Sequence, residues 1–279
     1  MKPPEILFLA GGLIAFSAGS AAAFGAIRAG SDRFISAIRA TAVLGACCFA
    51  ALLTTVGARE GRFPVGSTFE AFVFLAAATS VAALLLDLWR RMPILLIATL
   101  PLSLLTALLA LSLTLTPPPP PAPPDGANLS SVRIAVHVAG ALASYAAFAM
   151  AFASGIVYLV SQRLLKKHGP SPVFGLMPPL ETTARINVRS IAAGVVLLAI
   201  GLVVGYLYAR EIYAGQRVWR LDPKVFLTTI TVLAYAAVLG LSRRPRFKGR
   251  RTALASVAGF VLVLATFWAN VFWSRFHSF

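Results

Sequence analysis

The sequence predicts an all-α integral membrane protein with about eight transmembrane helices. Of its 279 residues, 58% are hydrophobic and only 12% are charged. The apolar residues form continuous runs of about 20 residues, long enough to cross a hydrocarbon core about 30 Å thick. Continuous runs predict helices, because the strands of a membrane β-barrel are shorter and alternate polar with apolar residues. A soluble protein of this length would carry far more charge.

Eight segments satisfy the length rule. They cover residues 6–27, 40–56, 68–88, 93–115, 134–160, 190–208, 225–241 and 252–272. The first follows a short N-terminus without a small-residue cleavage site, so we expect it to be retained as a span. The second contains Cys47 and Cys48, which we expect to pack as small apolar residues. Trp268 and Trp273 lie near the outer end of the eighth segment, where an interfacial aromatic belt is expected.

Basic residues in the short loops predict the orientation. The loops after the first, third, fifth and seventh segments contain 16 of the 25 Lys and Arg residues, so we expect them to be cytoplasmic. These residues are Arg28, Arg33, Arg39, Arg90, Arg91, Arg163, Lys166, Lys167, Arg185, Arg189, Arg243, Arg244, Arg246, Lys248, Arg250 and Arg251. Both termini are then extracytoplasmic. The net charge of +16 is explained by membrane topology and contact with lipid, and we expect no nucleic acid partner.

A Pro-rich segment at residues 117–124 interrupts the series of spans. Proline cannot continue a helix and favours an extended chain, so this segment predicts an external linker. We therefore expect an N-terminal four-helix membrane half at 1–116, a linker at 117–130 and a C-terminal four-helix half at 131–279.

Two of the three histidines, His137 and His277, lie on the extracytoplasmic side in this topology. The external loop 209–224, which contains Trp219 and Asp222, reaches the same face. Two neutral imidazoles on opposite sides of a flat cofactor, with an aromatic side chain beneath it, are what six-coordinate haem ligation needs. The third histidine, His168, falls in a cytoplasmic loop, where we expect it to be solvated.

Further residues on this face could complete a haem site. Arg217, Arg220 and Arg275 could pair with the haem propionates, because guanidinium groups bind carboxylates in a bidentate manner. Asp222 could orient a ligand histidine through its second ring nitrogen. Topology alone also allows an ordinary alternative, in which His137 is a helix-start residue and His277 belongs to a frayed tail.

Several short elements occur in a fixed order along the chain. They are Gly61-Arg62-Phe63-Pro64 with Phe69-Glu70, His137-Val138 before Ser144-Tyr145-Ala146, Glu181 with Arg185 and Asn187, Trp219 with Asp222-Pro223-Lys224, and His277-Ser278-Phe279. In order and spacing they resemble the cytochrome c assembly proteins of the CcsA, CcmC and HemX types, which are haem-handling membrane proteins with a tryptophan-rich WWD domain. The resemblance is clearest from about residue 131 to 279.

The resemblance implies a protein that holds non-covalent, b-type haem at the extracytoplasmic surface. The tryptophan-rich loop would lie along the haem, and His137 and His277 would ligate the iron. The chain departs from the family pattern in four places. Leu221 replaces a tryptophan, Val225 a glutamate, Arg62 a histidine and Gly240 an intramembrane histidine. These departures favour a divergent member, and its compact length is similar to that of HemX-type proteins.

The main hypothesis is therefore a haem-binding protein of cytochrome c biogenesis in the inner (cytoplasmic) membrane. It would present or carry haem to apocytochrome c or to other cytochrome c assembly subunits. No hydrolase, kinase or nucleotide-binding motif is present, so catalysis by the chain would be limited to positioning haem in an attachment system. Two alternatives stay open: a HemX-like membrane regulator of haem biosynthesis, and a cofactor-free structural subunit of a membrane complex.

Overall fold

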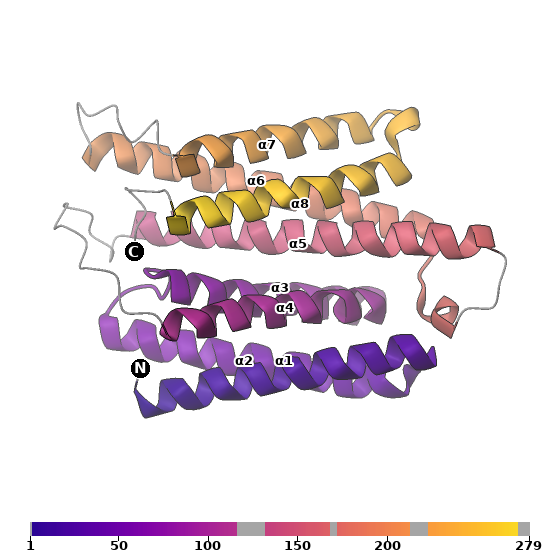
Figure 1. Ribbon diagram of the computed structural model, residues 1–279. Coiled ribbons are helices and arrows are strands. Elements are labelled where there is room, and N and C mark those ends of the chain that lie inside the picture. The colour runs from indigo at the N-terminus through magenta and orange to yellow at the C-terminus, as the bar shows by residue number, and fades with distance from the viewer. Residues whose placement is uncertain (1, 116–131, 168–171, 213–222, 273–279) are drawn as a thin grey trace.

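The described part of the chain forms eight long helices, and consecutive helices run in opposite directions (Figure 1). The structure, a computed structural model, describes residues 2–115, 132–167, 172–212 and 223–272. The helices are α1 (Pro3–Ala29), α2 (Ile35–Glu60), α3 (Thr68–Arg90), α4 (Pro93–Thr114), α5 (Val132–Lys167), α6 (Leu180–Ile212), α7 (Pro223–Ser242) and α8 (Arg250–Phe272). Each is long and apolar enough to cross a membrane, and no described residue lies in a strand. The all-α class and the number of spans are thereby confirmed.

Local sequence sets the ends of several helices. Gly30 and Gly61 follow α1 and α2 with φ of 58° and 61°, in the left-handed region that glycine adopts without strain. The side chain of Ser67 caps the start of α3, and Pro93 occupies the first turn of α4, where its missing N–H breaks no helical bond. Short turns between helices are therefore encoded next to the apolar runs.

The helix ends form two opposite faces of the bundle (Figure 1). The starts of α1, α3, α5 and α7 lie at one end, together with the last turns of α2, α4, α6 and α8. We call this the His137 end, because His137 lies in the second turn of α5. The other end, here the basic end, exposes Arg28, Arg90, Arg91 and the segment 243–246. The first turn of α1 and the last turn of α8 are thus on the same side.

Two sets of four helices pack side by side (Figure 1). Helices α1–α4 contact one another, as do α5–α8, and α5 joins the two sets by packing on α3 and α4. The turn η2 (Pro172–Leu176) also contacts α1. The proposed domain division at 117–130 stays a prediction, because residues 116–131 lie outside the described residues.

Aromatic rings fit against glycines where helices approach closely. At Gly12 of α1 an added Cβ would lie 2.1 Å from the ring of Phe49, and at Gly45 of α2 it would lie 2.4 Å from the ring of Phe16. The two rings meet edge to face with centroids 5.3 Å apart. Lipid offers no hydrophobic driving force between helices, so this close packing supplies much of the association.

Helices α5 and α6 extend beyond the spans predicted at 134–160 and 190–208. They contain 36 and 33 residues, or about 54 and 50 Å of helix at 1.5 Å per residue. The prediction stopped where charge begins, but Arg163, Lys166 and Glu181 are good helix formers and continue the helices outside the apolar core. Both helices therefore project past a hydrocarbon layer of about 30 Å.

Candidate functional site

His137 is the only residue of the predicted haem site that lies within the described part of the chain. Arg217, Trp219, Arg220, Asp222, Arg275 and His277 fall at 213–222 and 273–279, outside the described residues. The described helix ends next to these segments are the last turns of α6 and α8 and the first turn of α7. All three lie at the His137 end (Figure 1).

A hydrogen bond to the backbone of α6 fixes the imidazole of His137. Its Nδ1 lies 2.6 Å from the carbonyl oxygen of Gly201. A carbonyl only accepts, so Nδ1 carries the hydrogen and donates it. In the neutral ring the lone pair is then on Nε2, which is the tautomer that a metal-ligating histidine held through its other nitrogen adopts.

Two glycines on α6 make room for this histidine. At Gly205 an added Cβ would lie 2.4 Å from Cε1 of His137 and 2.5 Å from its Nδ1. At Gly201 it would lie 3.2 Å from the carbonyl oxygen of His137. Gly201 and Gly205 are four residues apart on one helix face, a spacing that allows close helix approach in membranes. The sequence interpretation missed both residues, although this spacing was visible.

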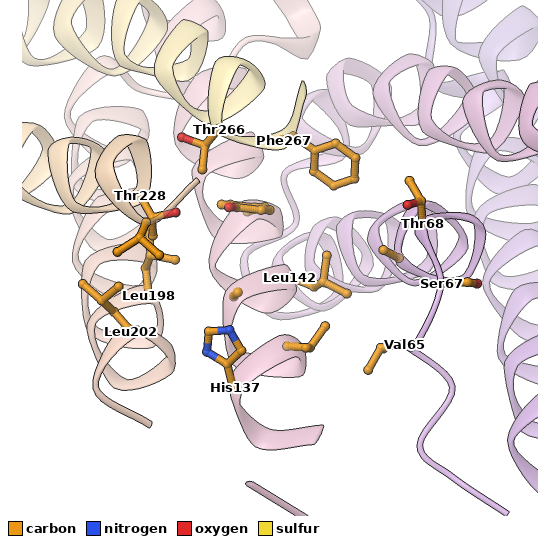
Figure 2. Close-up of a pocket in the computed structure, with 15 residues that line it drawn as sticks. Val65, Ser67, Thr68, His137, Leu142, Leu198, Leu202, Thr228, Thr266 and Phe267 are labelled. Atoms are coloured by element: carbon orange, nitrogen blue, oxygen red, sulfur yellow. The ribbon is translucent and has the colours of Figure 1, made fainter. Parts of the chain in front are cut away.

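A cavity of about 80 Å³ lies beside His137. Figure 2 shows fifteen side chains around it, from α3, α5, α6, α7, α8 and the segment before α3. Most are apolar, and among these lining residues only His137 and Tyr145 carry a titratable group. The hydroxyl of Thr266 of α8 forms a hydrogen bond of 3.1 Å with that of Thr231 of α7. The cavity is therefore a mostly apolar space with one imidazole in its wall.

An ion pair holds the segment before α3 against this cavity. The guanidinium of Arg62 makes two hydrogen bonds of 2.8 Å to the carboxylate of Glu70, which is only 4% exposed. The backbone N–H of Gly66 donates to the same carboxylate, also over 2.8 Å. The bond to Glu70 raises the pKa of Arg62, so this guanidinium stays charged. Val65, buried between these residues, forms part of the cavity wall.

Arg62 occupies the place where the resembling family has a histidine. Its side chain packs over Gly66, where an added Cβ would lie 2.3 Å from Nη1. The sequence interpretation treated Arg62 only as a departure from the pattern. The structure gives it a role in positioning the cavity wall, and the signal for this was Glu70 eight residues later.

A second ion pair lies at the His137 end of the bundle. Arg133, in the first turn of α5, pairs with Glu211, near the end of α6. Both side chains are exposed, at 61% and 60%, so solvent weakens the attraction. The pair nevertheless joins the two helices that position His137.

The residues present fit one side of a haem. His137 offers an imidazole nitrogen, and Tyr145 and Phe267 supply aromatic walls. The enclosed volume of about 80 Å³ is well below the roughly 300 Å³ at the lower end of small-molecule pockets. Only an edge of the macrocycle could enter it. Within the described residues no group of three or more His, Cys, Asp or Glu side chains could hold a metal ion.

Gly240 lies at an open position on α7, whereas His137 lies in a cavity wall. An added Cβ at Gly240 would meet no atom within 4 Å, so no described side chain packs against this face of α7. The family's intramembrane histidine is therefore replaced at an open position near the basic end, and His137 remains the one described histidine in a cavity wall.

Comparison with known proteins places these features in a family. The sequence model of the family described as "Cytochrome C assembly protein" matches residues 65–278, which is more than half of the chain. The match begins at the cavity wall before α3 and includes His137 and the segments at 213–222 and 273–278.

Curated relatives agree with the family match. The chain is similar to the cytochrome c biogenesis protein CcsA of Prochlorococcus marinus strain MIT 9312, with 29% identity over 235 residues, 75% of this chain and 72% of that protein. CcsA of strain MIT 9215 is 27% identical over 232 residues, 74% of this chain and 72% of that protein.

Proposed function

The chain belongs to the cytochrome c assembly protein family, and from that membership we propose that it binds haem at the His137 end for cytochrome c maturation. A role in cytochrome c assembly follows from the family, and eight spans make the chain a multi-pass membrane protein. In the proposal this end faces the extracytoplasmic side of the cytoplasmic membrane, because the opposite end contains most of the basic loops.

His137 is the observation that carries the proposal. Its Nδ1 is bonded to Gly201, and its ring is in the wall of a mostly apolar cavity. Helices α6 and α8 end and α7 begins at the same end of the bundle. In the proposal His137 is one axial ligand and His277 the other, and the haem is b-type and held without a covalent bond. Haem would supply the iron for this ligation and a vinyl edge for the cysteines of an apocytochrome.

The other proposed contacts come from the two segments outside the described residues. Trp219 would lie along the macrocycle, and Asp222 would orient a ligand histidine. Arg217, Arg220 and Arg275 would pair with the propionates. In this arrangement only an edge of the macrocycle enters the cavity, and these two segments would cover the rest of its surface. The chain's own contribution is to bind and position.

An optical spectrum of the reconstituted protein tests the proposal. The purified chain is incubated with haemin, excess haemin is removed, and the Soret band is recorded for wild type, His137→Ala, His277→Ala and His168→Ala. We expect the band to be lost or displaced in the first two variants and unchanged in His168→Ala. Added imidazole should restore the band in His137→Ala, because it replaces the missing ligand without changing the fold.

A cofactor-free structural subunit is the second candidate, and the small volume of the cavity favours it. This candidate requires that the wild-type chain gains no Soret band and that His137→Ala changes nothing in the spectrum. A folded, haem-free wild-type protein would therefore reject haem binding and retain the subunit role.

The HemX-like regulator remains a third candidate because of the exposed arginines at 243–246 on the basic end. Regulation would act through a cytoplasmic surface. A pull-down that recovers the tRNA-dependent first enzyme of haem synthesis would support this candidate, whereas recovery of apocytochrome would support the main proposal.

A further inference from the structure

A second, larger cavity lies between the two sets of helices. Its volume is about 230 Å³, and side chains from α3, α4, α5 and α8 line it. The lining contains no charged residue, and its polar members are Thr79, Thr106 and Tyr145. The hydroxyl of Thr106 donates to carbonyls of its own helix over 3.0 and 3.2 Å. This hydroxyl therefore needs no water in the cavity.

This cavity is a groove open to the hydrocarbon of the membrane. Leu105 of α4 and Val261 and Leu264 of α8 line it and are 53%, 64% and 46% exposed. All three lie inside the apolar spans. The molecules that surround this surface in a bilayer are acyl chains.

The length of the groove identifies its occupant. Along α8 it extends from Val257 to Phe267, which is about 15 Å at 1.5 Å per residue. That is half of a hydrocarbon core of about 30 Å. The range 257–267 lies at the middle of α8, so the groove lies around the centre of the bilayer, where the ends of acyl chains meet. A partner's transmembrane helix would need a groove through the whole thickness.

The inner wall of the groove is also the wall of the His137 cavity. Tyr145 and Phe267 line both spaces. The ring of Phe267 lies 4.5 Å from that of Phe72 on α3 and 6.1 Å from that of Tyr145 on α5, measured between centroids. Phe267 thus lines both the lipid-facing groove and the cavity beside His137, and Figure 2 shows its ring at the edge of that cavity.

We propose that this groove binds part of one acyl chain of a phospholipid, with Phe267 separating the chain from the His137 cavity. Lipid tails are as apolar as the groove, so binding comes from packing rather than from exclusion of water. An unfilled groove forfeits dispersion contacts along its lining, and a chain restores them. Binding of the acyl chain in the groove does not depend on haem. Phe267 keeps the chain out of the cavity next to the imidazole of His137.

Photolabelling in bilayers tests the site. The full chain is placed in phosphatidylcholine nanodiscs containing a small fraction of phosphatidylcholine with a diazirine in the middle of one acyl chain. Adducts are located by mass spectrometry after illumination. Val261 and Leu233 provide a matched pair, because they are 64% and 63% exposed and only Val261 lines the groove. We expect adducts at Val261 in excess of those at Leu233.

Groove-filling variants decide between a site and ordinary boundary lipid. Leu264→Trp places a larger side chain at the groove mouth and should abolish the excess at Val261, whereas Leu233→Trp should leave it unchanged. Leu105→Trp fills the groove from α4 and should have the same effect as Leu264→Trp. If one of these two variants does not fold, the other still provides the test. Equal labelling of Val261 and Leu233, unaffected by these variants, would overturn the proposal.

Variants at Phe267 test the separation. Phe267→Ala should open the groove into the His137 cavity and produce adducts at Leu142, which lines only that cavity. Phe267→Leu keeps most of the side-chain volume and should not. Absence of labelling at Leu142 in a folded Phe267→Ala protein would reject the role of Phe267.

Discussion

Helices α1–α4 and α5–α8 use different polar interactions in the same apolar setting. In α1–α4 the prominent ones are ion pairs near helix ends, such as Arg39 with Asp87, where the guanidinium Nε lies 2.6 Å from Oδ2. In α5–α8 they are neutral: the amide of Asn187 donates to Ala151 over 2.6 Å and to Ser256 over 2.8 Å. Water and headgroups reach the helix ends, so charge is tolerated there, whereas the interior favours neutral partners.

The difference also concerns function. The set α5–α8 provides the imidazole and most of the side chains around the cavity beside it. The set α1–α4 contributes α3 and the segment before it, held by Arg62 and Glu70. We infer that charge in the first set fixes the scaffold, while neutral hydrogen bonds in the second leave the cavity mostly apolar.

The largest expected effect comes from removing the partner of a buried carboxylate in α1–α4. Asp87 is fully buried and holds Arg39 by two bonds, the second of 3.1 Å. Arg39→Met leaves an unpaired buried carboxylate, which should cost about 3 kcal/mol of unfolding free energy, the low end for such pairs because Arg39 is partly exposed. Unfolding in mixed micelles of rising SDS fraction measures the change.

A matched exposed arginine and a double variant control this prediction. Arg28→Met removes an arginine that lies over the ring of Phe24 and should change stability little. Arg39→Met with Asp87→Leu should recover most of the loss, because the double variant leaves no uncompensated charge. A double variant as unstable as Arg39→Met alone would contradict the assignment of the cost to Asp87.

The next largest effect is expected at Gly205, and it tests whether α5–α8 pack around His137. Gly205→Ala puts a methyl group into the space of the imidazole and should displace it from Gly201. We expect a loss of about 1–3 kcal/mol, the usual cost of overpacking, and weaker haemin binding than wild type. Gly240→Ala is the matched control, since its Cβ meets no atom within 4 Å. Equal behaviour of the two variants would reject the role of Gly205.

A smaller effect is expected at the neutral interior of α5–α8. Asn187→Leu removes the bonds that join α6 to α5 and α8, and should cost about 1 kcal/mol, within the range measured for interhelical hydrogen bonds in membranes. The value is modest because Oδ1 of Asn187 is buried without a partner among the described residues, so the substitution also removes an unsatisfied atom. SDS unfolding compares it with Ser112→Ala, whose hydroxyl is exposed. A loss of unfolding free energy as large as that of Arg39→Met would contradict the prediction that neutral hydrogen bonds in α5–α8 contribute less than the ion pair in α1–α4.

Much of the fold could be predicted from the sequence, because only helices and closed β-barrels can span a bilayer. Continuous apolar runs must be helices, and all eight were located. The fifth span was predicted to end at Val160, but α5 continues to Lys167, because charge does not end a helix. The contact between α5 and α3 could not be predicted, because both helices are apolar over most of their surface and periodicity does not select a partner.

The site was less predictable than the spans. His137 was identified from topology and resemblance, but the acceptor of its Nδ1 is a backbone carbonyl 64 residues away, and no side-chain pattern encodes such a partner. Gly205 and Glu70 could have been singled out by spacing, as part of a small-residue pair and as a carboxylate close to Arg62. The remaining site residues are outside the described part, and their roles stay predictions.

The smallest effect should come from the exposed ion pair between α5 and α6. Arg133→Ala removes the partner of Glu211, and because both side chains are exposed we expect a change within about 0.5 kcal/mol that vanishes in high salt. Glu211→Ala and the double variant complete a cycle in the same SDS assay. A coupling above about 1 kcal/mol would mean that a charged pair helps to hold α5 against α6, and the second set would then share the strategy of the first. A negligible coupling leaves the backbone bond of His137 and the glycines of α6 as the interactions that place the imidazole.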